Sequence, residues 1–385
     1  MEPPRNGVKA MDVYYNPVRA IWGPGSFAKL EEVLESLSSK RIALFCGSRS
    51  FKESGCEEKL LPLISRYKIV RFDRIPSHPD ISDVLEIHRQ AKNYRFDTFI
   101  AIGGGSVLDM AKAIKAASSL DLNSEEDLRK IIGTSDFQPG HEAIVAIPTT
   151  SGSGSELTKW ATVWDKDNQK KYSIDHPALY PDFALVDPSL TYSLTLRTSV
   201  TSGLDALCHA VEAYWAKESN ECSRAFSLTG ASRILVGLEQ LFHQELKEEA
   251  RNNLSLGSLN AGYAFSHTRT TACHAMAYPL TLRYGIEHGI AVTMTLASIL
   301  LYNLPYLNDQ KALFAALKID SPNDLQERVN SICSRAGIKT KLRDYGVNKE
   351  ELAAIAAECF TKGRMDNNPY LLTVEEVNHI LHHIY

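Results

Sequence analysis

Residues 97–106 read DTFIAIGGGS, and this stretch decides the predicted fold. The run Asp97–Ile102 is typical of a buried strand, and three glycines follow it directly. The next stretch, Val107–Ser119, has the apolar spacing of a helix. A strand, a glycine-rich turn and a helix in this order predict one unit of a parallel sheet, with a phosphate-binding turn at the start of the helix.

Similar segments lie on both sides of this unit. Three more runs are interpreted as buried strands: Arg41–Cys46, Ile69–Phe72 and Glu142–Ile147. Helical patterns such as Ile81–Tyr94 lie between them, so the first half predicts a parallel sheet covered by helices on both faces. Two further extended segments follow, at Trp160–Trp164 and Phe183–Val186.

From about Thr195 the pattern changes, because apolar residues now recur three and four positions apart. This spacing predicts helices at Gly203–Trp215, Ser223–Leu246, Asn252–Phe265, Ala291–Tyr302, Asp324–Ala336 and Lys349–Phe360. The predicted fold class is therefore α/β plus all-α. A nucleotide-binding domain over residues 1–190 precedes a helical domain over residues 191–385, with a ligand cleft between them.

The composition of the chain limits its class and its partners. Its 385 residues are 44% hydrophobic and 23% charged, as expected for a folded protein, and the net charge of -4 argues against nucleic acid as a partner. The start, MEPPRNGVKAMD, lacks the apolar core of a signal peptide, and no uncharged apolar run approaches the roughly 20 residues that span a bilayer. Seven cysteines without a C-x-x-C pair favour the cytoplasm.

Two glycine-rich segments follow predicted strands. Gly103-Gly104-Gly105-Ser106 opens the helix that carries Asp109 and Lys112, and its small residues would let the backbone approach a phosphate. The second segment, Pro148–Glu156, reads PTTSGSGSE and offers many donors with little bulk. A plain strand-to-helix turn and a flexible linker are the alternatives, but the position after buried strands favours ligand loops.

One carboxylate and three imidazoles form a candidate metal site. Asp205 and His209 are one helical turn apart, so both side chains leave the same face of the predicted helix. His274 and His288 follow, fourteen positions apart. This donor set suits Fe²⁺ or Zn²⁺, although a single histidine is more often an ordinary core or surface residue.

Taken together, these motifs resemble the iron-containing (group III) alcohol dehydrogenases. The resemblance runs from Gly23-Pro24-Gly25-Ser26 to Asn367-Asn368-Pro369 and includes Asp205-x-x-x-His209-x-x-Glu212. It implies a metal held by Asp205, His209, His274 and His288, and a small aldehyde reduced with NAD(P)H. It also implies cofactor contacts from Gly104, Gly105, Ser106, Asp109, Thr149, Thr150 and Ser153.

The chain departs from the family pattern at Tyr278, where many members have a second histidine four residues after the third ligand. A tyrosine can donate a proton, so Tyr278 is the candidate catalytic acid.

The segments Lys159–Asp165, Lys171–Ser173 and Thr268–Thr271 are similar to a narrower branch, the phosphonoacetaldehyde reductases. That resemblance implies 2-hydroxyethylphosphonate as the product and a cationic pocket for the substrate. The candidate substrate residues are Lys159, Trp160, Phe265, Arg269 and Thr270. Lys159 and Arg269 could equally be surface charges.

Two other functions remain open. One is a general butanol- or propanediol-type dehydrogenase. The more distant one is a sugar-phosphate cyclase or lyase of the dehydroquinate synthase type, which would need extra cations around the metal. The segment His274–His288 instead supplies Met276, Tyr278, Pro279 and Leu280, which disfavours the cyclase.

The turn after Arg41–Cys46 predicts a preference for NADPH, with NADH tolerated. It contains Gly47, Ser48 and Arg49 and has no acidic residue before Glu53, so nothing there would repel a 2′-phosphate. A water-facing Arg49 is the alternative. We expect a homodimer that binds only small molecules, with neither nucleic acid nor a membrane as a partner.

Overall fold

The computed structural model describes residues 13–48, 50–134, 137–168 and 170–385. Within these ranges the first half of the chain forms a six-stranded parallel sheet of order β1-β8-β5-β4-β2-β3. The strands are β1 (Arg19–Trp22), β2 (Arg41–Cys46), β3 (Lys68–Phe72), β4 (Thr98–Gly103), β5 (Ala143–Pro148) and β8 (Phe183–Val186). The four strands predicted first are confirmed, whereas β1 was not predicted.

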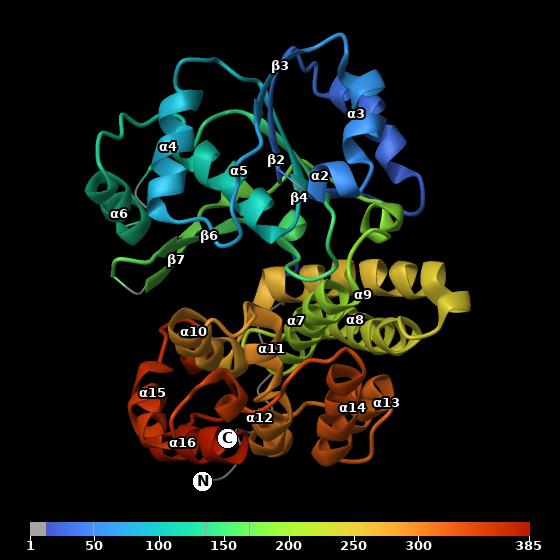
Figure 1. Cartoon of the computed structure of the whole chain (residues 1–385), viewed down its shortest axis with the longest axis vertical. Helices are drawn as coiled ribbons and strands as arrows, with labels where there is room; N and C mark the ends of the chain where they lie inside the picture. Colours follow the sequence, from blue (N-terminus) through green and yellow to red (C-terminus); the bar gives the residue numbers. More distant parts are fainter. Residues whose placement is uncertain (1–12, 49, 135–136, 169) are drawn as a thin grey trace.

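Helices cover both faces of this sheet, which explains why its strands are apolar without alternation. In β2, Ala43 and Phe45 face the core formed with α4 (Ile81–Ala91), α5 (Gly105–Ala117) and α6 (Glu125–Thr134). Ile42 and Leu44 face the core formed with α1 (Leu30–Ser36), α2 (Ser50–Glu53) and α3 (Cys56–Ile64). Figure 1 shows the two helix layers on either side of the strands.

A separate hairpin extends from the sheet half toward the helices (Figure 1). It consists of β6 (Trp160–Asp165) and β7 (Lys170–Asp175), which pair antiparallel. The sequence predicted an extended segment for β6 only. The second strand, KKYSID, is partly exposed and carries two lysines, so it lacks the apolar run by which the other strands were found.

The second half is helical and encloses one large apolar core. Its helices are α7 (Leu196–Trp215), α8 (Glu221–Gln240), α9 (Lys247–Thr268), α10 (Ala272–Tyr284), α11 (His288–Thr293), α12 (Leu296–Asn303), α13 (Gln310–Leu317), α14 (Pro322–Arg335), α15 (Leu352–Glu358) and α16 (Val374–His383). A parallel-sheet half followed by a helical half confirms the predicted fold class.

Two of the predicted helices differ from the structure, because Ala291–Tyr302 spans parts of α11 and α12, and Ser223–Leu246 runs past the end of α8 at Gln240. Helices α10, α13 and α16 were not predicted. Helix α10 is buried on nearly all sides and contains Pro279, so it shows neither an amphipathic pattern nor the composition expected of a helix interior.

The prediction that no apolar run approaches the length of a membrane span was wrong for the segment His288–Tyr306. It is 19 residues long and apolar enough, by length and composition alone, to cross a membrane. In the structure it is divided among α11, α12 and a short 3-10 helix, and 67% of its most apolar window is buried inside the protein. Its apolar character is therefore that of a core segment.

Candidate active site

A cavity of about 760 Å³ lies between the sheet half and the helical half. Thirteen of the residues singled out from the sequence line it: Gly105, Ser106, Asp109, Ser153, Trp160, Asp205, His209, Phe265, Arg269, Thr270, His274, Tyr278 and His288. Residues more than 180 positions apart in the chain therefore meet at one place, and both halves contribute to it.

The four candidate metal ligands meet on the helical side of this cavity. Asp205 and His209 lie one turn apart on α7, His274 is on α10, and His288 is the first residue of α11. Ligand atoms of Asp205, His209 and His274 all lie within 4.8 Å of one another. The Oδ1 atom of Asp205 is 3.6 Å from His274 Nε2 and 4.0 Å from His288 Nε2.

This cluster has the chemistry of a divalent metal site. Asp205 Oδ1 and His274 Nε2 are buried and have no hydrogen-bond partner among the described residues. Buried polar atoms are normally paired, so two such atoms facing each other indicate a missing ligand. The Nδ1 atom of His209 lies 3.3 Å from the Gly152 carbonyl oxygen and can donate to it, which leaves Nε2 to bind a metal.

Glu212 forms a second layer behind the candidate ligands. Its Oε1 atom accepts from Thr271 Oγ1 at 2.8 Å and from the Cys273 amide at 2.8 Å, and its Oε2 atom contacts His274 Nδ1. This carboxylate therefore fixes the start of α10 and the orientation of the His274 ring, as carboxylates behind metal-binding histidines commonly do.

Gly289 explains how His288 reaches Asp205. A Cβ atom at Gly289 would lie 1.9 Å from the carbonyl oxygen of Thr201 and 3.3 Å from Asp205 Cβ. Only glycine therefore allows the start of α11 to approach α7 closely enough for the two side chains to face each other.

The charges in this cluster favour a positive charge between the carboxylates of Asp205 and Glu212. Burial opposes the charged form of Asp205, but the imidazoles of His209, His274 and His288 lower its pKa. Burial likewise opposes a charged His274, yet Glu212 and Asp205 raise its pKa to about 9. Burial lowers the pKa of His209 to about 4, which leaves this imidazole neutral and able to bind a metal at pH 7.

The two glycine-rich segments meet on the sheet side of the cavity. Strand β4 ends at Gly103, and α5 begins at Gly105 without a side-chain cap on its first turn. A Cβ atom at Gly105 would lie 2.7 Å from Ser153 Oγ, so the second segment packs directly against the first.

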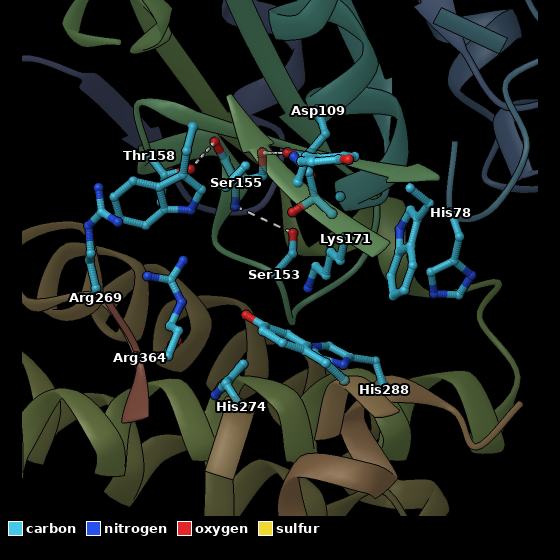
Figure 2. A pocket seen from close by; sticks show the side chains of 18 of the residues that line it. His78, Asp109, Ser153, Ser155, Thr158, Lys171, Arg269, His274, His288 and Arg364 are labelled. Carbon is cyan, nitrogen blue, oxygen red and sulfur yellow. Dashed lines mark hydrogen bonds between the residues drawn. The ribbon is translucent and has the colours of Figure 1, made fainter. Parts of the chain in front are cut away.

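Asp109 and Lys112 hold this arrangement together. Lys112 is fully buried and donates to Ser155 O at 2.6 Å, Thr158 Oγ1 at 3.0 Å and Trp160 O at 3.0 Å. Asp109 accepts from Ser155 Oγ at 2.6 Å and from the Thr162 amide at 3.0 Å, as Figure 2 shows for Ser155. Both carboxylate oxygens of Asp109 thus have protein partners, which is an arrangement that anchors the loop.

The remaining cofactor candidates lie outside this cavity. Gly47, Ser48, Gly104, Thr149 and Thr150 are not among its lining residues, and Arg49 lies outside the described residues. Thr149 is buried and its amide donates to the Gly103 carbonyl at 2.9 Å, so it links β5 to the glycine turn. Because β2 pairs with β4, the turn after Cys46 lies at the same sheet edge as the glycine turn.

The two cations expected for the substrate are engaged elsewhere. Lys159 does not line the cavity, and its Nζ atom lies 3.3 Å from Asp175 Oδ1. Arg269 lines the cavity but pairs with the same carboxylate. Arg269 directly follows α9, and α10 starts only at Ala272, so Arg269 and His274 do not share a helix.

Other cations line the cavity, and they were not predicted from the sequence to contact the substrate. Lys171, Lys362 and Arg364 line the cavity. The Nζ atom of Lys171 lies 4.4 Å from the centre of the Tyr278 ring, and Figure 2 shows Lys171 and Arg364 near the space above His274 and His288. In the sequence, Lys171 belongs to the segment that resembles the phosphonoacetaldehyde reductases. Arg364 lies three residues before the Asn367-Asn368-Pro369 motif, which was the available signal.

The pKa of Tyr278 depends on these charges. Burial would raise the pKa of its phenol, but Lys171, Arg364 and His274 together lower it to about 8. Its ring is nearly parallel to that of His288, with 6.2 Å between the ring centres.

A parallel sheet with glycine-rich loops, facing a buried carboxylate and imidazole cluster across a cleft, is the arrangement of a metal-assisted, nucleotide-linked dehydrogenase. Comparison with protein families agrees with this class. Residues 17–188 match the iron-containing alcohol dehydrogenase model, and residues 199–385 match the C-terminal model of the Fe-containing alcohol dehydrogenase family. The chain belongs to the iron-containing alcohol dehydrogenase family and is an oxidoreductase acting on CH–OH groups.

Individual relatives narrow the comparison. The chain is 31% identical to a phosphonoacetaldehyde reductase of Streptomyces viridochromogenes, over 80% of each chain. It is 27% identical to a 1,3-propanediol dehydrogenase of Klebsiella pneumoniae, over 92% of this chain and 94% of the other. The crystal structure of a sulfoacetaldehyde reductase from Bifidobacterium kashiwanohense in complex with NAD⁺ is 25% identical, with a TM-score of 0.87 and coverage of 97% and 99%.

Proposed function

We propose that this enzyme reduces phosphonoacetaldehyde to 2-hydroxyethylphosphonate, with NADPH preferred over NADH. The observation that carries the proposal is the cation-lined cavity beside the candidate metal ligands, to which Lys171, Arg269, Lys362 and Arg364 contribute. Two relatives point the same way. A phosphonoacetaldehyde and a sulfoacetaldehyde are both two-carbon aldehydes that end in a tetrahedral anionic group.

Each part of the site has a defined task in this proposal. A divalent iron or zinc ion would supply a Lewis acid, and a reduced nicotinamide would supply the hydride. Asp205, His209, His274 and His288 would hold the ion, and Glu212 would keep His274 oriented. Gly104, Gly105 and Ser106 would hold the cofactor pyrophosphate, and Thr149, Thr150 and Ser153 would line the cofactor. Tyr278 transfers the proton of its hydroxyl to the oxygen of the substrate.

The same proposal covers the organisation of the protein. We place the domain boundary near residue 190, between β8 and α7, and expect a cytoplasmic homodimer. Membership in an alcohol dehydrogenase family disfavours a sugar-phosphate cyclase or lyase. The argument from the segment His274–His288 does not extend to the whole cavity, because Lys171 and Arg364 line it from distant segments.

A general short-chain alcohol dehydrogenase is the second candidate. It is favoured by the aromatic wall of the cavity, where Trp160, Trp164 and Phe265 would suit an apolar substrate. The relatives named 1,3-propanediol dehydrogenase and NADPH-dependent butanol dehydrogenase also match over most of the chain, by 27% and 26% identity.

An aldehyde comparison separates the two functions. The rate of NADPH oxidation is measured with phosphonoacetaldehyde and with 3,3-dimethylbutanal, a neutral aldehyde of nearly the same shape. The proposal expects the anionic aldehyde to have the higher kcat/KM. An equal or lower value with phosphonoacetaldehyde would support the general dehydrogenase.

The metal assignment has its own test in the variant His274→Ala. We expect it to lose most of its bound metal and nearly all turnover while keeping the wild-type circular dichroism spectrum. A variant with full metal content and a normal rate would contradict the assignment of His274 as a ligand.

A further inference from the structure

We propose that Lys171 and Arg364 together form the binding site for the anionic group of the substrate. This inference rests on the proposed function and adds the residues that decide between charged and neutral aldehydes. It replaces Lys159 and Arg269, which the sequence had suggested for this role.

Lys171 is a half-buried cation that faces the reaction space. It projects from β7 over two aromatic rings, with Nζ 4.4 Å from the centre of Tyr278 and 5.2 Å from the centre of Trp164. Among the described residues, no carboxylate lies within 4 Å of this ammonium group. Its charge nevertheless acts across the site, because it contributes to lowering the pKa of His288.

Arg364 approaches from the helical half. Its Nε atom is buried and has no hydrogen-bond partner in the described part of the chain, although Nη1 donates to the Gly363 carbonyl at 3.0 Å. An unpaired guanidinium N–H beside a cavity costs free energy unless a ligand accepts from it. Figure 2 shows this side chain near the space above His274.

The loop that carries Arg364 is held firmly in place. Asn367 donates to the Thr268 carbonyl at 2.8 Å and to the Thr270 carbonyl at 3.0 Å, which ties the loop to the turn between α9 and α10. Asn368 exchanges side-chain amide hydrogen bonds with Asn303 at 2.8 and 3.0 Å. The position of Arg364 is therefore built into the fold.

Lys171 and Arg364 line the same cavity as Tyr278, with Lys171 Nζ 4.4 Å from the centre of its ring, and both charges lower the pKa of its phenol. Tyr278 is also the candidate proton donor, and its ring lies beside that of His288. An anionic group bound by these two cations would thus lie close to the metal ligands, as a two-carbon aldehyde requires. Two positive charges with no salt bridge to a carboxylate in the described part of the chain also match the double negative charge of a phosphonate.

Lys159 and Arg269 are weaker candidates because one carboxylate already compensates them. Asp175 lies 3.3 Å from Lys159 Nζ and also pairs with Arg269. An incoming anion would have to compete with Asp175 and would meet its repulsion.

The test uses the enzyme loaded with metal and four single variants. Lys171→Gln and Arg364→Gln remove the proposed contacts, Lys170→Gln removes an exposed lysine from the same strand, and Arg269→Gln tests the earlier candidate. We expect Lys171→Gln and Arg364→Gln each to lower kcat/KM for phosphonoacetaldehyde, relative to 3,3-dimethylbutanal, by about ten- to a hundredfold. Lys170→Gln should leave this ratio within about twofold of wild type.

The ratio matters because either substitution could also alter Tyr278, which would slow both aldehydes equally. Equal losses on both aldehydes, or a raised KM for NADPH without a change in the ratio, would overturn the inference. A change in the ratio for Arg269→Gln alone would return the role to Arg269.

Binding of ethylphosphonate, an unreactive probe, separates this inference from the proposed function. Calorimetry with the metal- and cofactor-loaded enzyme should show binding to the wild type and to Lys170→Gln, and weaker binding to Lys171→Gln and Arg364→Gln. If the wild type binds the probe through these residues but does not prefer phosphonoacetaldehyde, the proposed substrate fails and the anion site stands. If the wild type does not bind the probe, the anion site fails.

Discussion

Glu212 sets the geometry of the site although it does not line the cavity. It is fully buried, and its two oxygens accept from the start of α10 and contact His274 Nδ1. The contact with His274 selects the ring tautomer in which Nε2 is free for a metal. A carboxylate here also stabilises a positive charge on the far side of the imidazole.

We predict that Glu212→Gln weakens metal binding by about ten- to a hundredfold, because the amide loses the charge that orients and polarises His274. The free energy of unfolding should fall by about 1–3 kcal/mol, since buried donors lose an acceptor. Metal competition with a chelator and urea unfolding measure the two effects. Glu218→Gln, at an exposed position shortly after α7, is the control. Unchanged metal affinity in Glu212→Gln would remove it from this role.

Ser48 lies just after β2, where a substitution can test the preference for NADPH over NADH. We predict that Ser48→Asp lowers kcat/KM for NADPH while that for NADH stays or rises, because a carboxylate repels the 2′-phosphate. The exposed Ser65 offers the control variant Ser65→Asp. Steady-state kinetics with both cofactors decide the matter. A wild type that prefers NADH, or a Ser48→Asp variant with unchanged NADPH use, would show that this turn does not contact the ribose.

At the scale of elements, the β6–β7 hairpin connects the two sides of the cavity. It carries Trp160, Trp164 and Lys171 into the lining, and Asp165 anchors its end to α6. Asp165 accepts from Arg129 Nε at 2.9 Å and Nη2 at 3.2 Å, and from Asn168 Nδ2 at 2.8 Å. The hydrogen bonds from Arg129 outweigh burial and lower the pKa of Asp165 to about 2.

We predict that Asp165→Asn lowers the free energy of unfolding at pH 7 by about 1–3 kcal/mol. A depressed pKa in the folded state means that the ionised group stabilises above its unfolded pKa, near 4. This stabilisation is lost as the pH falls from about 4 toward 2, so the two proteins should converge there. Urea midpoints across this pH range provide the measurement. Asp167→Asn, exposed in the same turn, is the control, and a pH-independent difference would contradict the account.

At the scale of the molecule, all four candidate ligands belong to the helical half, whereas the glycine loops belong to the sheet half. Asp205 Oδ1 and His274 Nε2 are buried and have no hydrogen-bond partner within the described ranges. Metal binding should therefore stabilise chiefly the packing of α7, α10 and α11.

We predict that chelation lowers the melting temperature and reduces hydrogen-exchange protection in α7, α10 and α11, with β4 and β5 little changed. A ligand present at 100 times its Kd contributes about 2.7 kcal/mol to the folded state. Calorimetry and hydrogen exchange with and without chelator test this expectation. Asp205→Asn, which should bind the metal poorly, should show no further loss. Protection lost uniformly over both halves would speak against a site confined to the helices.

Features that depend on neighbouring residues could be predicted from the sequence alone. The buried strands, the glycine turn before α5 and the Asp205–His209 pair are local patterns, because strand and helix periods place side chains within a few positions of one another. The ordered motifs also carried the family resemblance, which the family comparisons confirm. Two elements could not be predicted even from local patterns. Helix α10 is apolar on nearly all sides and β7 is charged, so neither alternates between apolar and polar residues as a typical helix or strand does.

The distant side chains that share the cavity could not be predicted in this way, because they are brought together by tertiary packing. His274 and His288 reach Asp205 because α10 and α11 pack on α7, with Gly289 allowing the closest approach. Lys171 and Arg364 arrive from opposite halves, while Lys159, close to the glycine-serine loop in sequence, lies outside the lining and pairs with Asp175. The physical reason is that a charge acts through the space around it. Its partners there depend on packing between elements that no local period encodes.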